Sequence, residues 1–247
     1  MGAWRQLQSL PRRRFGVPVG GPWDREAAQL ALALLKEQGE GRVFEILHGT
    51  VEARIDGLGT ISVVGTDGRV TVSGRVSPLG VRRPVGLGDI VCVQARCAYL
   101  AWSPVRLNQA KLDWKSKSVQ TLRYLPSQAE GLEYEVSVSP ASSRAGVRLI
   151  GLPPGNGGER PSEPCCVGAI QQTPGGELLI IGPDGPTIGG YPRLGTVIEA
   201  DLNRVPRLSP AQKINIIPVS LEVALTNGTA ARDRSFQLCR TLLADTS

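Results

Sequence analysis

The residues of this chain that are best suited to chemistry gather in four short segments rich in glycine and polar side chains. The first, residues 16–25, places Gly20 and Gly21 just before Asp24, where a helix is expected to begin. Backbone N–H groups of adjacent glycines can face an anion there, helped by the helix dipole. A simple turn with a helix cap requires the same residues, so this segment alone leaves both interpretations open.

The second segment, residues 142–149, carries two arginines around a glycine. On a strand, Arg144, Gly146 and Arg148 point to one face. Two guanidinium groups in this arrangement form a fork for a carboxylate or a phosphate. The alternative is a pair of solvent-exposed arginines on an edge strand.

The third and fourth segments combine ionisable side chains with loop backbone rich in glycine. Glu163 follows a stretch rich in glycine and proline, residues 153–164, which predicts a loop, and Gln171 stands at an expected strand start. Loops of this kind carry function when a rigid scaffold presents them. The fourth segment brings an acid, a hydroxyl, a phenol and a cation around two glycines: Asp184, Thr187, Gly189, Gly190, Tyr191 and Arg193.

Familiar catalytic and metal-binding signatures do not occur in the sequence. There is neither a phosphate-binding GxxxxGK[ST] loop nor a GxSxG nucleophile elbow. The single histidine, His48, excludes a metal site with two histidine ligands and favours a structural role for this side chain. Five cysteines without a CxxC pair support neither a disulfide framework nor a zinc ribbon. We therefore expect no metal and no cofactor bound by this chain itself.

The elements that position these segments are mostly short strands. Hydrophobic residues make up 41% and charged residues 20% of 247 residues, which is typical of a globular protein. Frequent glycine and proline turns favour sandwiches or barrels over βαβ units. Strands are expected at residues 43–47, 51–55, 61–64, 70–72, 90–93, 132–138, 147–152, 178–181, 196–200 and 214–225, with a hairpin turn at Asp67-Gly68.

One helix is predicted at residues 25–37. Asp24 is a favourable N-cap and Glu26 lies in the first turn, while the residues that follow are apolar nearly all round. This pattern indicates a buried helix. We predict a mainly β protein with one or two short buried helices. It is expected to have two parts, residues 1–130, which include this helix, and residues 131–247.

The charge distribution raises the question of an anionic partner. Twenty-eight basic and 22 acidic residues give a net charge of +6, concentrated near Arg12 and between Arg106 and Arg123. These are either solvated surface patches or docking sites for an anionic ligand or acidic subunit. Aromatic residues are only 4% and no recognition motif occurs, so nucleic acid is not indicated. No signal peptide and no apolar run of membrane-spanning length is found, which predicts a soluble cytoplasmic protein without membrane contact.

The order of motifs GVPVGGPWDR, YLA, SRAGVRL, SEP, GAIQ and TIGGYPR, with Asp201-Leu202 after them, resembles one family. It is the KipA family, also called allophanate hydrolase subunit 2 or biotin-dependent carboxyltransferase-like, which includes the C-type subunit of bacterial 5-oxoprolinase. The resemblance implies a cyclophilin-like barrel in residues 131–247. It also implies a KipI-type partner (allophanate hydrolase subunit 1-like), a large third subunit in the 5-oxoprolinase case, and a small amide or ureide substrate. ATP on a partner subunit or carboxybiotin would then be the co-reactant.

Roles for individual residues follow from this resemblance. Asp184 or Glu163 would accept a proton from an amide nitrogen. The backbone N–H groups of Gly189 and Gly190, with Arg144 or Arg148, would stabilise charge on the carbonyl oxygen. The expected substrate-binding set is completed by Gln171, Thr187, Tyr191, Arg193, Gly20, Gly21 and Asp24.

Two departures from the family pattern favour a different function. Pro186 stands where typical members have a glutamine, and a GGI…GSxST segment that usually follows the YLA motif is missing after Ala101. A non-catalytic binding or regulatory module of the same family is therefore the alternative. The presence of Arg144, Asp184 and Tyr191 argues for the enzyme subunit.

Overall fold

The computed structural model describes residues 2–6, 13–37, 41–112, 114, 118–128, 131–154 and 161–244. The chain forms two compact units that alternate along the sequence. The first unit comprises Met1–Gln8, Asp24–Lys117 and Asp233–Ser247, and the second comprises Ser9–Trp23 and Ser118–Arg232. This division differs from a single cut near residue 130, because the chain enters each unit more than once.

The first unit is built on one antiparallel sheet. Its strand order is β1-β2-β6-β3-β5-β7, with β4 paired to β3. The sheet surrounds an apolar cluster of valine, isoleucine, leucine and alanine side chains, and a second cluster lies on its other face. The strands are β1 (Gly2–Gln6), β2 (Arg42–Arg54), β3 (Gly59–Val72), β4 (Arg75–Ser77), β5 (Val81–Val85), β6 (Ile90–Ser103) and β7 (Ala110–Lys111).

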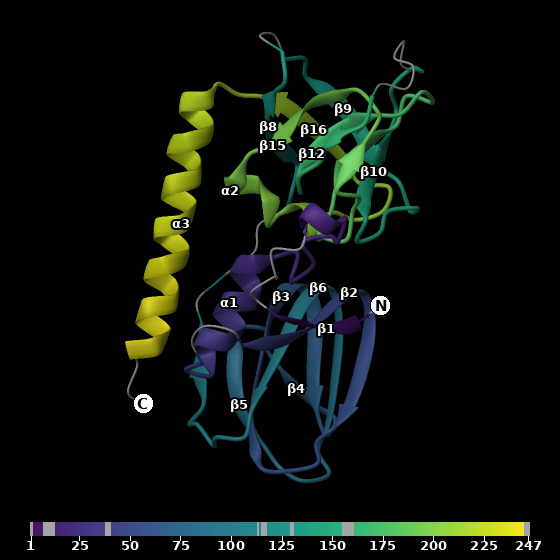
Figure 1. Ribbon diagram of the computed structural model, residues 1–247. Helices are drawn as coiled ribbons and strands as arrows, with labels where there is room; N and C mark the ends of the chain where they lie inside the picture. The colour runs from purple at the N-terminus through teal and green to yellow at the C-terminus, as the bar shows by residue number, and fades with distance from the viewer. Residues whose placement is uncertain are drawn as a thin grey trace. The chain divides into compact units, whose positions relative to one another are not determined.

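Helix α1 (Arg25–Leu34) confirms the predicted buried helix. The Asp24 carboxylate accepts a hydrogen bond from the Ala27 N–H at 3.0 Å, as an N-cap should. The helix packs on β3 and β6 (Figure 1). The Ser62 hydroxyl donates a hydrogen bond to the Ala31 carbonyl. It ends three residues before the predicted boundary, where Lys36 adopts a positive φ of 59° that no helix continues.

The predicted hairpin at Asp67-Gly68 is wrong. Strand β3 runs through both residues and pairs with β6 on either side of them. The hairpin turn lies instead at Ser73 and Gly74, which have positive φ values of 49° and 79° and connect β3 to β4. The same dipeptide signal thus marks a left-handed residue inside a strand rather than a turn.

The alternation of side chains shifts by one residue at a common level of β2, β6 and β3. His48 in β2 and Asp67 in β3 lie at this level with positive φ values of 46° and 47°. Strand residues normally alternate with a period of two, so an odd interval between residues of one core marks a shift. The intervals in the apolar cluster are odd in all three strands: Ile46 to Val51, Val63 to Val70 and Ala95 to Ala98.

The second unit is a closed barrel with the strand order β10-β13-β12-β15-β8-β16-β9. Neighbouring strands are antiparallel except β16 and β8, which run parallel. The mainly β architecture predicted from the sequence is confirmed. The barrel strands are β8 (Thr121–Pro126), β9 (Tyr134–Val138), β10 (Gly146–Ile150), β12 (Ala169–Gln172), β13 (Leu178–Ile181), β15 (Arg193–Val197) and β16 (Lys213–Pro218), and a separate pair is formed by β11 (Glu163–Pro164) and β14 (Ile188–Gly189).

Helix α3 (Leu221–Ala244) replaces the second half of the strand predicted at residues 214–225. Strand β16 ends at Pro218, and the Ser220 hydroxyl then accepts a hydrogen bond from the Val223 N–H. This serine is an N-cap signal that the sequence contains. The helix was missed because it has no continuous apolar stripe: Leu221, Leu225 and Phe236 are all exposed.

A buried aspartate joins helix α2 (Glu199–Leu202) to strand β8. The Asp201 side chain is 1% exposed and accepts hydrogen bonds from the backbone N–H, Nε and Nη2 of Arg123 at 2.8–2.9 Å. Arg204 donates a further bond at 2.9 Å. Arg123 therefore stabilises the fold through Asp201 and is not part of the basic surface patch predicted between Arg106 and Arg123. Arg12, Lys115 and Lys117, which belong to the predicted basic patches, lie outside the described residues.

Candidate functional site

The second and fourth polar segments meet in the second unit through one ion pair. Arg144 Nε lies 2.7 Å from Asp184 Oδ2, and Arg144 Nη2 lies 3.0 Å from Asp184 Oδ1. This is the bidentate geometry that a planar guanidinium makes with a carboxylate. The Arg144 side chain is 10% exposed and the Asp184 side chain 37%. Residues 40 positions apart in the sequence thus form one ion pair, with the arginine mostly buried and the aspartate partly exposed.

The first segment joins the same cluster through its backbone. Arg144 Nη2 also donates to the Gly21 carbonyl at 2.8 Å, and the Gly20 N–H donates to the Pro183 carbonyl at 2.9 Å. We call the set Gly20, Gly21, Arg144 and Asp184 the arginine clamp. It orders the glycine loop by contacts to both the side chain of Arg144 and the backbone beside Asp184.

Two glycines allow the clamp to form. The Gly182 N–H donates to the Ala145 carbonyl at 2.9 Å, and a Cβ on Gly182 would collide with the Arg144 carbonyl oxygen. A Cβ on Gly185 would lie 2.5 Å from the Ala145 carbonyl oxygen, closer than side chains approach backbone. The loop at residues 182–185 therefore needs glycine at both positions to lie on the turn that carries Arg144.

Arg144 and Arg148 do not share one strand face. Strand β10 begins at Gly146, and Arg144 precedes it in a turn closed by reciprocal backbone bonds between Ser143 and Gly146. Arg148 makes its own ion pair, 2.7 Å from Glu177, with both side chains more than a third exposed. The two arginines thus hold different carboxylates and form no common fork in the described structure.

A second cluster surrounds the glycines of the fourth segment. Glu163 in β11 pairs in register with Gly189 in β14. A Cβ on Gly189 would lie 2.5 Å from Nε2 of Gln171 and 2.9 Å from Sγ of Cys165, so a larger residue would have to displace these side chains. The Gln171 side chain is 4% exposed and donates from Nε2 to Cys165 Sγ at 3.2 Å. Gln171 is therefore a fixed support beneath the glycine backbone.

Cys165 is a member of this cluster that the sequence motifs did not indicate. It follows Ser162-Glu163-Pro164 directly, which was the available signal. Its N–H donates to the Thr187 carbonyl at 2.8 Å. Burial raises the pKa of its thiol, whereas the positive charges of Arg193 and Arg13 act in the opposite direction. Both arginines therefore lie within electrostatic reach of Cys165.

The remaining predicted site residues have varied positions. Tyr191 is 38% exposed, and Arg193 pairs with Gln171 across β15 and β12. Thr187 and Gly190 flank β14 and are partly buried. Asp24 belongs to the first unit, where it caps α1. Its backbone N–H donates a hydrogen bond to the Tyr99 hydroxyl at 2.7 Å.

The family model described as "Carboxyltransferase domain, subdomain A and B" matches residues 15–103 and 116–218, most of the chain. The chain belongs to this carboxyltransferase domain family. The match is interrupted between residues 103 and 116, which is the region where the sequence departs from typical members after Ala101.

Curated relatives share about a third of this carboxyltransferase domain. Urea amidolyase of Lachancea kluyveri is 40% identical over 94 residues, which are 34% of this chain and 5% of that protein. The C-type subunit of 5-oxoprolinase from Escherichia coli strain K12 is 34% identical over 90 residues, 36% of this chain and 29% of that protein. The chain thus spans less than a third of the length of either relative.

A solved structure has the same fold. The crystal structure of the K. lactis urea amidolyase superposes with a TM-score of 0.81 at 19% identity, covering 96% of this chain and 19% of that one. This likeness extends across both units and establishes the architecture of the carboxyltransferase domain.

The two candidate site carboxylates, Asp184 and Glu163, have different surroundings. Because Arg144 binds both oxygens of Asp184, the pair stabilises the ionised carboxylate and fixes the guanidinium. Glu163 is exposed and makes no side-chain hydrogen bond or ion pair with another described residue. The oxygens of Glu163 are therefore open to solvent, whereas those of Asp184 are occupied by Arg144.

The described residues show neither a metal-binding cluster nor a membrane-spanning helix. No group of three or more His, Cys, Asp or Glu side chains in the described ranges is arranged to hold a metal ion. Among the helices of this described part, none is both long and apolar enough to cross a membrane.

Proposed function

We propose that this carboxyltransferase domain is the C-type subunit of a 5-oxoprolinase-like, allophanate-hydrolase-like or carboxyltransferase-like complex that acts on a small amide or ureide. A KipI-type subunit would be its partner, joined in the 5-oxoprolinase case by a large subunit. The arginine clamp carries this proposal, because it brings together three segments on which the family resemblance depends. The relationship to the C-type subunit of a 5-oxoprolinase and to urea amidolyase supports it.

The chemistry requires a proton acceptor and stabilisation of negative charge. Glu163 accepts the proton of an amide nitrogen, and the adjacent backbone of Gly189 and Gly190 faces the carbonyl oxygen as charge develops. Arg144, held rigidly by Asp184, supplies a fixed positive charge. ATP on a partner subunit would supply the driving force for hydrolysis of the amide, or carboxybiotin would supply the carboxyl group for its transfer.

The alternative is a non-catalytic binding or regulatory module. The interruption of the family match between residues 103 and 116 favours it, as does Pro186, which offers neither a side-chain hydrogen bond nor a backbone N–H. In that case the arginine clamp serves only to order the glycine loop.

The test is reconstitution. The chain is co-purified with a KipI-type subunit, and the complex with a large subunit is assayed for ATP-dependent release of glutamate from 5-oxoproline. We expect Glu163→Gln to lower the rate about 100-fold or more, as for loss of a general base. Arg144→Gln should lower it by a similar factor, as for loss of a fixed charge that stabilises the transition state.

Glu135→Gln is the matched control, because Glu135 is 73% exposed and lies in β9 of the same unit. It should leave the rate unchanged. A stable complex with turnover on no small amide or ureide would support the binding module instead. Failure to form any complex would contradict the proposed partnership.

A further inference from the structure

The segment of the first unit that interrupts the family match has a defined conformation. The match stops at residue 103 and resumes at residue 116. Between these points the structure describes residues 104–112 as a loop that leads into the short edge strand β7. We call residues 104–112 the anchored loop, because buried side chains of the sheet hold its backbone.

A buried threonine fixes the first half of the anchored loop. Thr60 in β3 is completely buried, and its hydroxyl donates a hydrogen bond to the Val105 carbonyl at 2.8 Å. The same hydroxyl accepts the Leu107 N–H at 2.8 Å. One side chain thus satisfies both a carbonyl and an amide of the loop backbone.

A buried arginine fixes the second half. Arg82 in β5 is almost completely buried, and its Nε donates to the Asn108 carbonyl at 2.6 Å. Its Nη1 donates to the Leu34 carbonyl in α1 at 3.2 Å. Strand β7 then pairs with β5, and Leu112 joins the apolar cluster that α1 helps to form. Because a buried guanidinium is costly unless its donors find acceptors, these contacts favour one conformation of the loop.

The side chains that the loop presents are of types that contribute strongly to protein–protein binding. Val105 is 57% exposed, and Arg106 is exposed without an ion pair to another described residue. Trp102, which precedes the loop, is 38% exposed and lies against Gly59, where a Cβ would be 2.8 Å from the indole Nε1. Tryptophan and arginine are enriched among residues that carry binding energy, and a loop already held in place loses less entropy on binding.

The charge of the anchored loop indicates the surface that it fits. Residues 104–112 contain two basic side chains, the exposed Arg106 and Lys111, and no acid. An acidic surface is complementary to them, and a basic surface repels them. A second copy of this chain has a net charge of +6, so it is a poorer match than an acidic partner.

We propose that the anchored loop and Trp102 dock onto an acidic surface of the KipI-type subunit. This inference rests on the function proposed above, from which the partner is taken. It gives the interruption of the family match a role, because the residues that depart from the family pattern are the ones that the fold holds rigid and presents to a partner. The loop then determines which partner subunit this chain selects.

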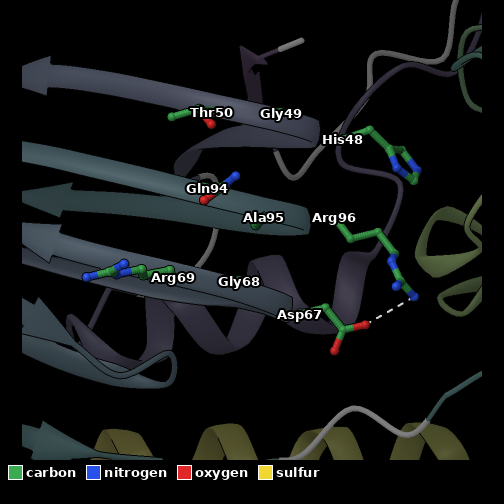
Figure 2. Close-up of a pocket in the computed structure, with 9 residues that line it drawn as sticks. All are labelled: His48, Gly49, Thr50, Asp67, Gly68, Arg69, Gln94, Ala95 and Arg96. Carbon is green, nitrogen blue, oxygen red and sulfur yellow. Dashed lines mark ion pairs between the residues drawn. The ribbon is translucent and has the colours of Figure 1, made fainter.

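A matched control lies on the open strand face of the same unit. Figure 2 shows Arg69 on β3, with its side chain extended away from Arg96. Arg96 is paired with Asp67 at 3.1 Å, so the two guanidinium groups do not converge on one ligand. Arg69 is exposed and, like Arg106, makes no ion pair with another described residue. Arg69→Glu therefore makes the same change of charge outside the anchored loop.

The test measures the Kd of the intact chain for the KipI-type subunit by isothermal titration calorimetry at low and at moderate salt. We expect Arg106→Glu to weaken binding about tenfold or more at low salt and less at moderate salt, because ions screen the lost attraction. Trp102→Ala should weaken binding about 30-fold at both salt concentrations, as for a central aromatic contact. Arg69→Glu should bind like the unmodified chain.

The Tm of each variant separates docking from folding. Arg106 makes no side-chain hydrogen bond with another described residue, so Arg106→Glu should keep the Tm of the unmodified chain. Equal affinities of Arg106→Glu and Arg69→Glu would overturn the docking role of the loop and leave the proposed partnership intact. Absence of binding by the unmodified chain would contradict the partnership itself, and this inference with it.

Discussion

Replacing Asp201 by asparagine should destabilise the second unit strongly. Asp201 is almost completely buried, and each of its oxygens accepts hydrogen bonds from Arg123, with Arg204 donating to Oδ1 as well. Asp201→Asn removes the negative charge and replaces one acceptor oxygen by an NH₂ group that points at arginine donors. Two guanidinium groups then remain without their counter-charge.

The expected loss follows from the exposure of the three partners. Breaking a fully buried ion pair costs about 3–5 kcal/mol. Arg123 and Arg204 are 27% and 28% exposed, so water partly solvates them after the change. We therefore expect a loss of about 2–4 kcal/mol in the free energy of unfolding. This corresponds to a decrease in Tm of roughly 4–16 °C for a chain of this size.

The assay is thermal and urea unfolding at pH 7, with Glu199→Gln as the control. Glu199 lies in the same short helix and also contacts an arginine, Arg232, but both side chains are more than half exposed. Exposed pairs contribute about 0–1 kcal/mol. A loss below about 1 kcal/mol for Asp201→Asn, or equal losses for the two variants, would refute the reasoning from burial.

The pH dependence gives a second measure of the same residue. Burial by itself raises the pKa of Asp201, but the hydrogen bonds from Arg123 and Arg204 and the charge of Arg204 together outweigh it and lower the pKa below its usual value. The charged carboxylate therefore stabilises the fold above the unfolded pKa of about 3.9, and this stabilisation is lost as pH falls through the folded pKa. The difference in Tm between the unmodified chain and Asp201→Asn should be constant from about pH 5 to 8 and shrink below about pH 4.

Two further predictions concern close contacts. Gly189→Ala should displace the Gln171 side chain from Cys165 and lower the free energy of unfolding by about 1–3 kcal/mol. It should also raise the rate at which a thiol reagent modifies Cys165, measured by mass spectrometry of the labelled peptides. An unchanged labelling rate would contradict the contact. Tyr99→Phe should cost about 2 kcal/mol in the free energy of unfolding, measured by urea titration, because the phenol donates to the buried Glu45 carboxylate at 2.9 Å; a neutral result would show that water or another group replaces it.

The elements that could be predicted are those with local signals. Helix α1 could be placed from the sequence because a capping aspartate is followed by a run of apolar residues too long for a typical strand. Asp67-Gly68 misled because a left-handed residue is needed both in hairpin turns and at the strand shift in β3. Helix α3 was missed because most of its residues are exposed and its packed apolar side chains, among them Leu238, Leu242 and Leu243, lie in its last turns.

The candidate site could be predicted in its members but not in its pairings. The resemblance selected both Arg144 and Asp184, yet nothing in their spacing shows that they bind each other. The same spacing argument placed Arg148 beside Arg144, whereas the structure gives it Glu177. Pairings across a barrel depend on strand order, which is a property of the whole chain rather than of any segment.

The alternation of the two units along the chain limits how the protein can be divided or recombined. A fragment that starts at Ser118 carries Arg144 and Asp184 but lacks the Gly21 carbonyl, the third partner of the clamp. Exchange of the second unit with that of a relative would need separate crossovers around Ser9–Trp23 and around Ser118–Arg232. No single cut of the chain therefore separates the two units. A chimaera made by a single exchange would combine Arg144 of one protein with the glycine loop of another.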